Sequence, residues 1–143
     1  MIDRLRRTTN DKLAAILRLL VGLIFVMAGV LKVVVPHLGG AFAGQLAAAS
    51  IPFRELSFIV VPVVEMLVGI SLILGWHARL SALVGSIVML VATYVHLVAD
   101  DPSLFPLQPV EPIGPLVLLA GLLYILFKGA GAWSADVGTA IYY

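Results

Sequence analysis

The sequence predicts an all-α membrane protein, a bundle of four transmembrane helices with a short interfacial helix between the first two. The 143 residues are 62% hydrophobic and only 12% charged, whereas a soluble domain carries about 25% charged residues. Four apolar stretches of roughly membrane-spanning length follow one another, and most lysine and arginine residues lie outside them. A chain of this length is expected to form one integral membrane domain over residues 1–143.

The composition excludes several classes of function. The chain has too little polar surface for a soluble enzyme and too much apolar surface for a disordered tail. The net charge of +1 gives no indication of a nucleic-acid partner. The absence of cysteine excludes a disulfide, a thiolate nucleophile and a cysteine-ligated cluster within the chain. No metal site and no covalent cofactor are expected, so any redox role must use a bound cofactor, substrate or partner.

The spans are expected at residues 13–35, 57–76, 80–99 and 113–128. In the first span, Arg18 and Lys32 flank a short uncharged centre, and both are expected to snorkel toward the interfaces. The second span contains one charge, Glu65, and the third contains His96 and no formal charge. The fourth span is short for a hydrocarbon core of about 30 Å, so it must extend past residue 128 or lie in a thinned bilayer.

The connections between the spans differ in length. Residues 36–40 are expected to be an irregular connection after the first span. In residues 41–50 apolar side chains recur at helical spacing, which predicts the short interfacial helix. Residues 75–79 form a tight turn between the second and third spans. Residues 100–112 contain four prolines and are expected to be an extended loop.

The placement of basic residues predicts the orientation. With four spans, most of the basic residues fall on the same side as the two termini, whereas the other side carries mainly acidic residues. The positive-inside rule then places both termini in the cytoplasm. We expect a multi-pass protein of the cell inner (plasma) membrane. The basic residues on the side of the termini are Arg4, Arg6, Arg7, Lys12, Arg79 and Lys128.

Three ionisable residues inside the spans, Lys32, Glu65 and His96, are the candidate functional residues. A charged group at the centre of a membrane helix costs roughly 2.5–3.5 kcal/mol on insertion scales, so such residues need a partner, water or a function. All three fall in the same half of the bundle, on stripes of small residues that face other helices. We expect one hydrogen-bonded cluster facing a cavity, for ligand binding or proton relay. The alternative is a structural lock between helices.

Several motifs follow one another along the chain. Residues 28–32 read Ala-Gly-Val-Leu-Lys, residues 48–52 read Ala-Ala-Ser-Ile-Pro, and residues 74–83 begin Leu-Gly-Trp-His-Ala-Arg. Residues 129–136 form a glycine-rich ending with a Ser-x-Asp motif. In this order and spacing the chain resembles the DoxX family of small four-helix membrane proteins. The resemblance implies a link to quinone-dependent oxidation of sulfur compounds and to resistance to oxidative and thiol stress. It also implies that Lys32, Glu65 and His96 are family positions.

Three functions agree with these observations. The first is a quinone- or small-molecule-binding subunit of a membrane redox or oxidative-stress system, because an acid and a histidine in an apolar cleft can bind quinone carbonyls and relay protons. The second is a non-enzymatic scaffold that recruits a soluble redox enzyme, and the third is a small proton-coupled carrier. The chain contains no complete catalytic set, so an oxidoreductase subunit and a non-enzymatic one both remain open. The partners considered are the lipid bilayer, a quinone or other small hydrophobic ligand, a redox protein and a second copy of the chain.

Overall fold

The computed structural model describes residue 4 and residues 6–137, and these residues contain helices and turns but no strand. Three helices are long and apolar enough to cross a membrane, namely α2, α4 and α5, whereas α6 is apolar but has only 16 residues. The four apolar helices begin and end within three residues of the expected spans. In chain order the elements are α2 (Lys12–Val34), α3 (Pro36–Ala48), α4 (Arg54–Leu74), α5 (Ala78–Val98), the 3-10 helix η1 (Pro102–Leu104) and α6 (Ile113–Lys128).

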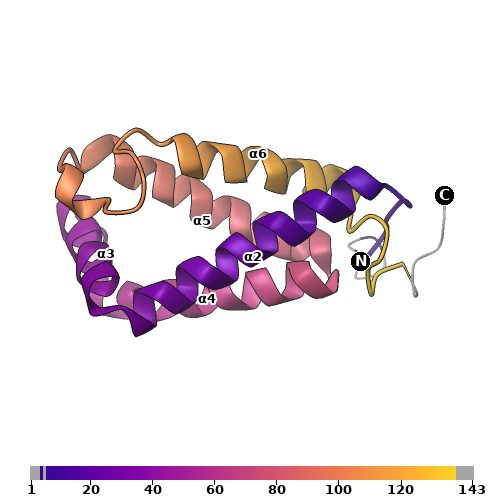
Figure 1. Cartoon of the computed structure of the whole chain (residues 1–143), viewed down its shortest axis with the longest axis horizontal. Coiled ribbons are helices and arrows are strands. Elements are labelled where there is room, and N and C mark those ends of the chain that lie inside the picture. The colour runs from indigo at the N-terminus through magenta and orange to yellow at the C-terminus, as the bar shows by residue number, and fades with distance from the viewer. Residues whose placement is uncertain (1–3, 5, 138–143) are drawn as a thin grey trace.

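The four apolar helices are arranged as two pairs, α2 with α4 and α5 with α6 (Figure 1). The pairs lie close together at the end where the described chain begins and ends, which we call the terminal end. They lie further apart at the opposite end, where α3 lies across the bundle (Figure 1). We call this opposite end the α3 end. Helix α3 contacts α2, α4, α5 and η1, so it joins the two pairs where they are most separated.

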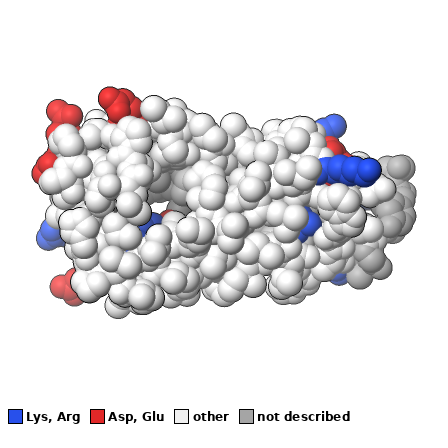
Figure 2. All heavy atoms as spheres, viewed as in Figure 1, with Lys and Arg blue, Asp and Glu red and all other residues white. Residues whose placement is uncertain are grey.

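On the face seen in Figure 2, the surface between the two ends carries almost no charge. Large hydrophobic side chains on all four apolar helices are exposed between the two ends, for example Leu23, Leu67, Leu90 and Val117. A soluble protein rarely exposes an apolar surface of this extent. The four apolar helices therefore present a belt suited to lipid, and the charged side chains on the outer surface of this face lie mainly at the two ends, which agrees with the expected membrane-protein character.

Glycine residues bring α2 and α4 into close contact. A Cβ atom added to Gly69 would lie 2.6 Å from the carbonyl oxygen of Gly22, and one added to Gly29 would lie 2.6 Å from that of Pro62. Small residues allow membrane helices to approach each other closely. The prediction that the small residues of these two helices face a neighbouring helix is thus confirmed.

Helix α3 differs from the expected interfacial helix in its position. It begins at Pro36 rather than near residue 41, so the expected connection over residues 36–40 is wrong. Proline suits the first turn of a helix because its missing N–H would have no partner there. A Cβ atom added to Gly39 would lie 2.7 Å from the carbonyl oxygen of Lys32, so this glycine lets α3 fold back closely onto the end of α2. The helix ends at Ala48, before Pro52, and Ser50 adopts a φ of 52°.

Arg18 does not snorkel to an interface, which corrects the expectation from the sequence. Its side chain is fully buried at the terminal end of the bundle. It donates to the carbonyls of Leu72 and Ile73 at 2.5 and 2.6 Å and to three carbonyls in residues 130–133 at 2.9 to 3.3 Å. All five guanidinium donors therefore have partners. The C-terminal end of α4 also carries partial negative charge, which stabilises the buried cation.

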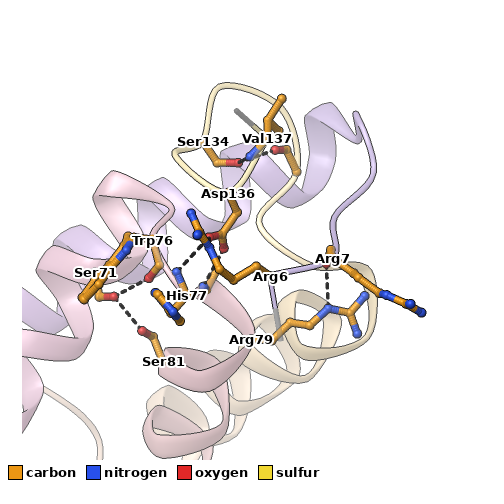
Figure 3. Close-up of polar contacts among 12 residues, drawn as sticks. Arg6, Arg7, Ser71, Trp76, His77, Arg79, Ser81, Ser134, Asp136 and Val137 are labelled. Atoms are coloured by element: carbon orange, nitrogen blue, oxygen red, sulfur yellow. Dashed lines mark hydrogen bonds and ion pairs between the residues drawn. The ribbon is translucent and has the colours of Figure 1, made fainter. Parts of the chain in front are cut away.

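Asp136 holds the beginning of α5 from a distant part of the chain (Figure 3). Its carboxylate is 1% exposed and accepts from the backbone N–H groups of His77 and Ala78, each at 3.0 Å. It also forms an ion pair with Arg6 at 3.1 Å. An acidic side chain stabilises the unpaired N–H groups at a helix N-terminus. The glycine-rich segment after α6 therefore closes the terminal end of the bundle.

Asp11 joins the start of α2 to α6. Its carboxylate accepts from the N–H groups of Leu13 and Ala14 and so caps the helix. The hydroxyl of Tyr124 donates to the same carboxylate at 2.9 Å. This hydrogen bond from Tyr124, together with the bonds from the cap, lowers the pKa of Asp11 below its ordinary value.

Candidate functional site

Glu65 lies inside the bundle on α4. It is 4% exposed and shares a buried stripe of that helix with Pro62, Val68, Gly69 and Leu72. It is eleven residues from the first residue of α4, Arg54, or about 16 Å along the helix axis. A carboxylate at this depth needs a partner, because an isolated ionised group is costly to bury.

Lys32 supplies that partner from α2. Its ammonium nitrogen Nζ lies 2.7 Å from both Oε1 and Oε2 of Glu65. The same nitrogen lies 4.8 Å from the centroid of the Phe42 ring on α3, which adds a cation–π contact. The Lys32 side chain is 22% exposed, whereas that of Glu65 is 5% exposed. The pair therefore joins α2 to α4 at the α3 end, and the predicted contact between these two residues is confirmed.

His96 lies near the end of α5 and is 6% exposed. Its Nδ1 atom lies 2.8 Å from the carbonyl oxygen of Val110, and its ring packs on Phe105 with centroids 4.1 Å apart. Both partners belong to the proline-rich connection before α6. Because a carbonyl oxygen only accepts, we assign the proton to Nδ1, which leaves Nε2 of the neutral ring as an acceptor.

The prediction that all three residues form one hydrogen-bonded cluster is wrong for His96. Its hydrogen bond in the described part of the chain goes to the loop and not to Glu65 or Lys32. The reason is that the loop folds back over the end of α5 and places the carbonyl oxygen of Val110 within hydrogen-bonding distance of the ring. The loop contains the short 3-10 turn η1 after Asp101, whose side chain caps the N–H of Ser103. It is otherwise irregular, as its prolines predict.

A cavity of about 710 Å³ brings the three residues together. Lys32, Glu65 and His96 all line it, so the predicted convergence on a cavity is confirmed. The cavity lies between the two helix pairs toward the α3 end, and most of its lining is apolar. Gln45 on α3 and Gln108 in the loop add the other hydrogen-bonding side chains. Cavities that bind small organic molecules have a similar volume and the same combination of apolar walls with a few polar groups.

The arrangement offers complementary hydrogen-bonding groups. An ammonium group has three donors, and two of those of Lys32 point to the oxygens of Glu65. One donor thus remains for another acceptor, and the Nε2 atom of His96 can accept. No group of three histidine, aspartate or glutamate side chains that could hold a metal ion occurs in residue 4 or residues 6–137.

Gln45, which helps to close the cavity, was not predicted from the sequence. Its Nε2 atom donates to the carbonyl oxygen of Leu104 at 2.5 Å and so joins α3 to η1. In the sequence, Gln45 is the only polar side chain among residues 38–48, and an amide in apolar surroundings needs a hydrogen-bond partner.

Comparison with known proteins places the chain in a family. The DoxX family model matches residues 13–97, a range that includes Lys32, Glu65 and His96. A protein of Haemophilus influenzae described as an uncharacterized protein is 33% identical over 124 residues, which are 85% of this chain and 87% of that protein. No solved structure matches the chain. The chain belongs to the DoxX family.

Proposed function

We propose that this protein binds a quinone or another small hydrophobic molecule in the cavity between its helix pairs, as a subunit of a membrane redox or oxidative-stress system. The observation that carries the proposal is the convergence of Lys32, Glu65 and His96 on one largely apolar cavity of about 710 Å³. Ionisable groups inside a membrane protein commonly mark ligand sites or proton paths.

The chemistry of a quinone fits the groups that line this cavity. A quinone ring presents carbonyl oxygens, which can accept from the remaining donor of Lys32 or from the amide groups of Gln45 and Gln108. Reduction to the quinol takes up two electrons and two protons. His96 and Glu65 are the groups suited to exchange those protons, and the electrons are exchanged with a redox protein partner.

We expect loss of the carboxylate of Glu65 to weaken ligand binding while the fold is retained. Glutamine keeps the shape of glutamate, so Glu65→Gln should remain folded. We expect the rise in melting temperature caused by decylubiquinone to fall by at least half, since a bound ligand stabilises the folded state by mass action. The measurement is thermal unfolding of the purified protein in detergent with and without decylubiquinone, and Glu55→Gln, at the exposed start of α4, is the control.

A double-mutant cycle separates ligand binding from a structural lock. Lys32→Met leaves Glu65 buried without its partner and should lower the free energy of unfolding by about 1–3 kcal/mol, the cost of a buried group without its hydrogen-bond partner. Adding Glu65→Gln should restore part of that loss. If Glu65→Gln changes stability and leaves the effect of decylubiquinone intact, the pair is a structural lock. The alternative function, a scaffold that recruits a soluble redox enzyme, is then preferred.

We further propose that α6 is a fourth membrane span, with both termini in the cytoplasm. Its 16 residues extend about 24 Å, which a locally thin bilayer can accommodate. The proposal rests on the basic residues near the terminal end and on the acidic residues Asp100, Asp101 and Glu111 near the α3 end. The whole chain would then form one multi-pass domain of the inner membrane.

Cysteine labelling tests this orientation directly, because the natural chain has no cysteine. Ser103 lies exposed in the loop at the α3 end, and Thr9 lies exposed at the terminal end. We expect Ser103→Cys to react with a membrane-impermeant maleimide on intact cells, or on spheroplasts where an outer membrane is present. We expect Thr9→Cys to react only after the inner membrane is permeabilised. The opposite pattern would mean that the orientation is reversed.

A further inference from the structure

We infer that the ligand enters the cavity from the bilayer, through a lateral opening between α2 and α6, and that it is an amphiphile whose apolar chain lies in that opening. This inference rests on the proposed ligand site and adds to it the entrance and the class of ligand.

The α3 end of the cavity is covered by helix α3 and the loop. Gln45 of α3 donates to the carbonyl oxygen of Leu104, and a Cβ atom added to Gly44 would lie 2.6 Å from the side chain of Leu104. The bond from His96 to the carbonyl oxygen of Val110 holds the other side of the loop to α5. A solute from water would therefore have to separate these contacts.

The side of the bundle is open instead. Figure 2 shows a hollow in the face on which Figure 1 places α2 and α6, with blue and red atoms visible inside it. Met27 of α2 and Val117 of α6 line the cavity, yet they are 52% and 65% exposed. We define these two residues as the rim of the opening.

The rim lies at the depth of the lipid chains. Met27 is seven residues before the last residue of α2, Val34, and Val117 is four residues after the first residue of α6, Ile113. At 1.5 Å per residue these positions lie about 10 Å and about 6 Å inside the helix ends. The opening therefore faces lipid chains, which favours a ligand that is already dissolved in the membrane.

Polarity changes along the path from the rim to the interior. The rim side chains are apolar, whereas Glu65 and His96 inside the cavity are ionisable and only 4% and 6% exposed. A molecule with a hydrogen-bonding head and an apolar chain matches this gradient. Its head would reach the polar groups while its chain remains in apolar surroundings. A ligand that is polar throughout would first have to cross lipid.

Filling the rim tests the inference. The probes are decylubiquinone, whose ring carries a ten-carbon chain, and the same ring without the chain. We expect Met27→Trp to raise the Kd for decylubiquinone at least tenfold and to change the Kd for the ring alone by less than twofold. Leu23→Trp is the matched control, because Leu23 lies one turn away on α2, is also 52% exposed and does not line the cavity. We expect it to change neither Kd.

These Kd values are measured by isothermal titration calorimetry of the full chain in lipid nanodiscs. The Kd of each probe is compared only between variants, because the partition of the probe into lipid is then the same in both measurements. Val117→Trp, on the opposite side of the rim, repeats the test if Met27→Trp does not fold. Equal effects of Met27→Trp and Leu23→Trp, or equal losses for both probes, would overturn the inference and leave the ligand site standing. Failure of the wild-type protein to bind either probe would overturn the proposed quinone site, and the inference with it.

Discussion

Arg18→Met is expected to lower the free energy of unfolding by on the order of 3–5 kcal/mol, the largest single effect that we predict for this chain. Five backbone carbonyls accept from the guanidinium group, and the side chain is fully buried. Methionine fills a similar volume but donates no hydrogen bond. The carbonyls of Leu72 and Ile73 lie at the C-terminal end of α4, where the helix no longer supplies its regular N–H partners, although the carbonyl of Leu72 also accepts from the N–H of Gly75 at 3.1 Å.

Two further variants show whether the effect comes from the donors. Arg18→Lys keeps the charge but offers fewer donors in a different geometry, so it should restore only part of the lost stability. Arg54→Met removes an exposed arginine at the α3 end and should change the free energy of unfolding by less than about 0.5 kcal/mol. Unfolding is followed in mixed micelles by titration with sodium dodecyl sulfate. If Arg18→Met is as stable as Arg54→Met, the carbonyl contacts contribute little to folding.

The buried position of Arg18 could not be predicted from the sequence. Near the beginning of an apolar helix, an arginine ordinarily extends toward the interface. In this structure the side chain of Arg18 stays inside the bundle because carbonyl groups in residues 130–133 accept hydrogen bonds from it. Hydrophobic periodicity carries no information on such an irregular segment. In the sequence, the glycines at 129 and 131 indicated that the chain could fold back there. In the structure both adopt a positive φ, which glycine allows.

The apolar helices, by contrast, could be predicted closely. Their boundaries depend on local features, namely prolines, glycines and charges next to long apolar runs, and the structure follows them within three residues. The start of helix α3 was misplaced because residues 36–40 were expected to be a connection and not part of the helix. Gly39 serves instead for close packing on Lys32, which depends on tertiary contact.

One part of the candidate site could be predicted from the free-energy cost of burying a charged group. A carboxylate and a lysine in the same half of a membrane protein must find partners, so the Lys32–Glu65 pair follows from the cost of leaving either alone. The ring of His96 can form a hydrogen bond with any nearby acceptor, and in the structure it does so with the loop carbonyl of Val110 at 2.8 Å. The path of a proline-rich loop is not encoded in a periodic pattern, so this contact became evident only in the structure.

Gly69→Ala is expected to lower the free energy of unfolding by about 1–3 kcal/mol, although alanine is intrinsically the better helix former. A Cβ atom at this position would lie 2.6 Å from the carbonyl oxygen of Gly22 and 2.7 Å from the backbone nitrogen of Val26. Backbone atoms cannot move aside as a flexible side chain can, so α2 and α4 would have to separate. Separation would also disturb the Lys32–Glu65 pair, which joins the same two helices.

Gly40→Ala provides the matched control for this contact. Gly40 is also helical, in α3, but a Cβ atom added there would meet nothing within 4 Å. The same substitution should therefore raise the free energy of unfolding by about 0.5–1 kcal/mol through helix propensity alone. Both variants are measured by denaturant titration in the same detergent. Because the change in intrinsic propensity is equal at the two sites, the opposite signs isolate the cost of separating α2 from α4. A gain in stability at both positions would show that these helices can move apart freely.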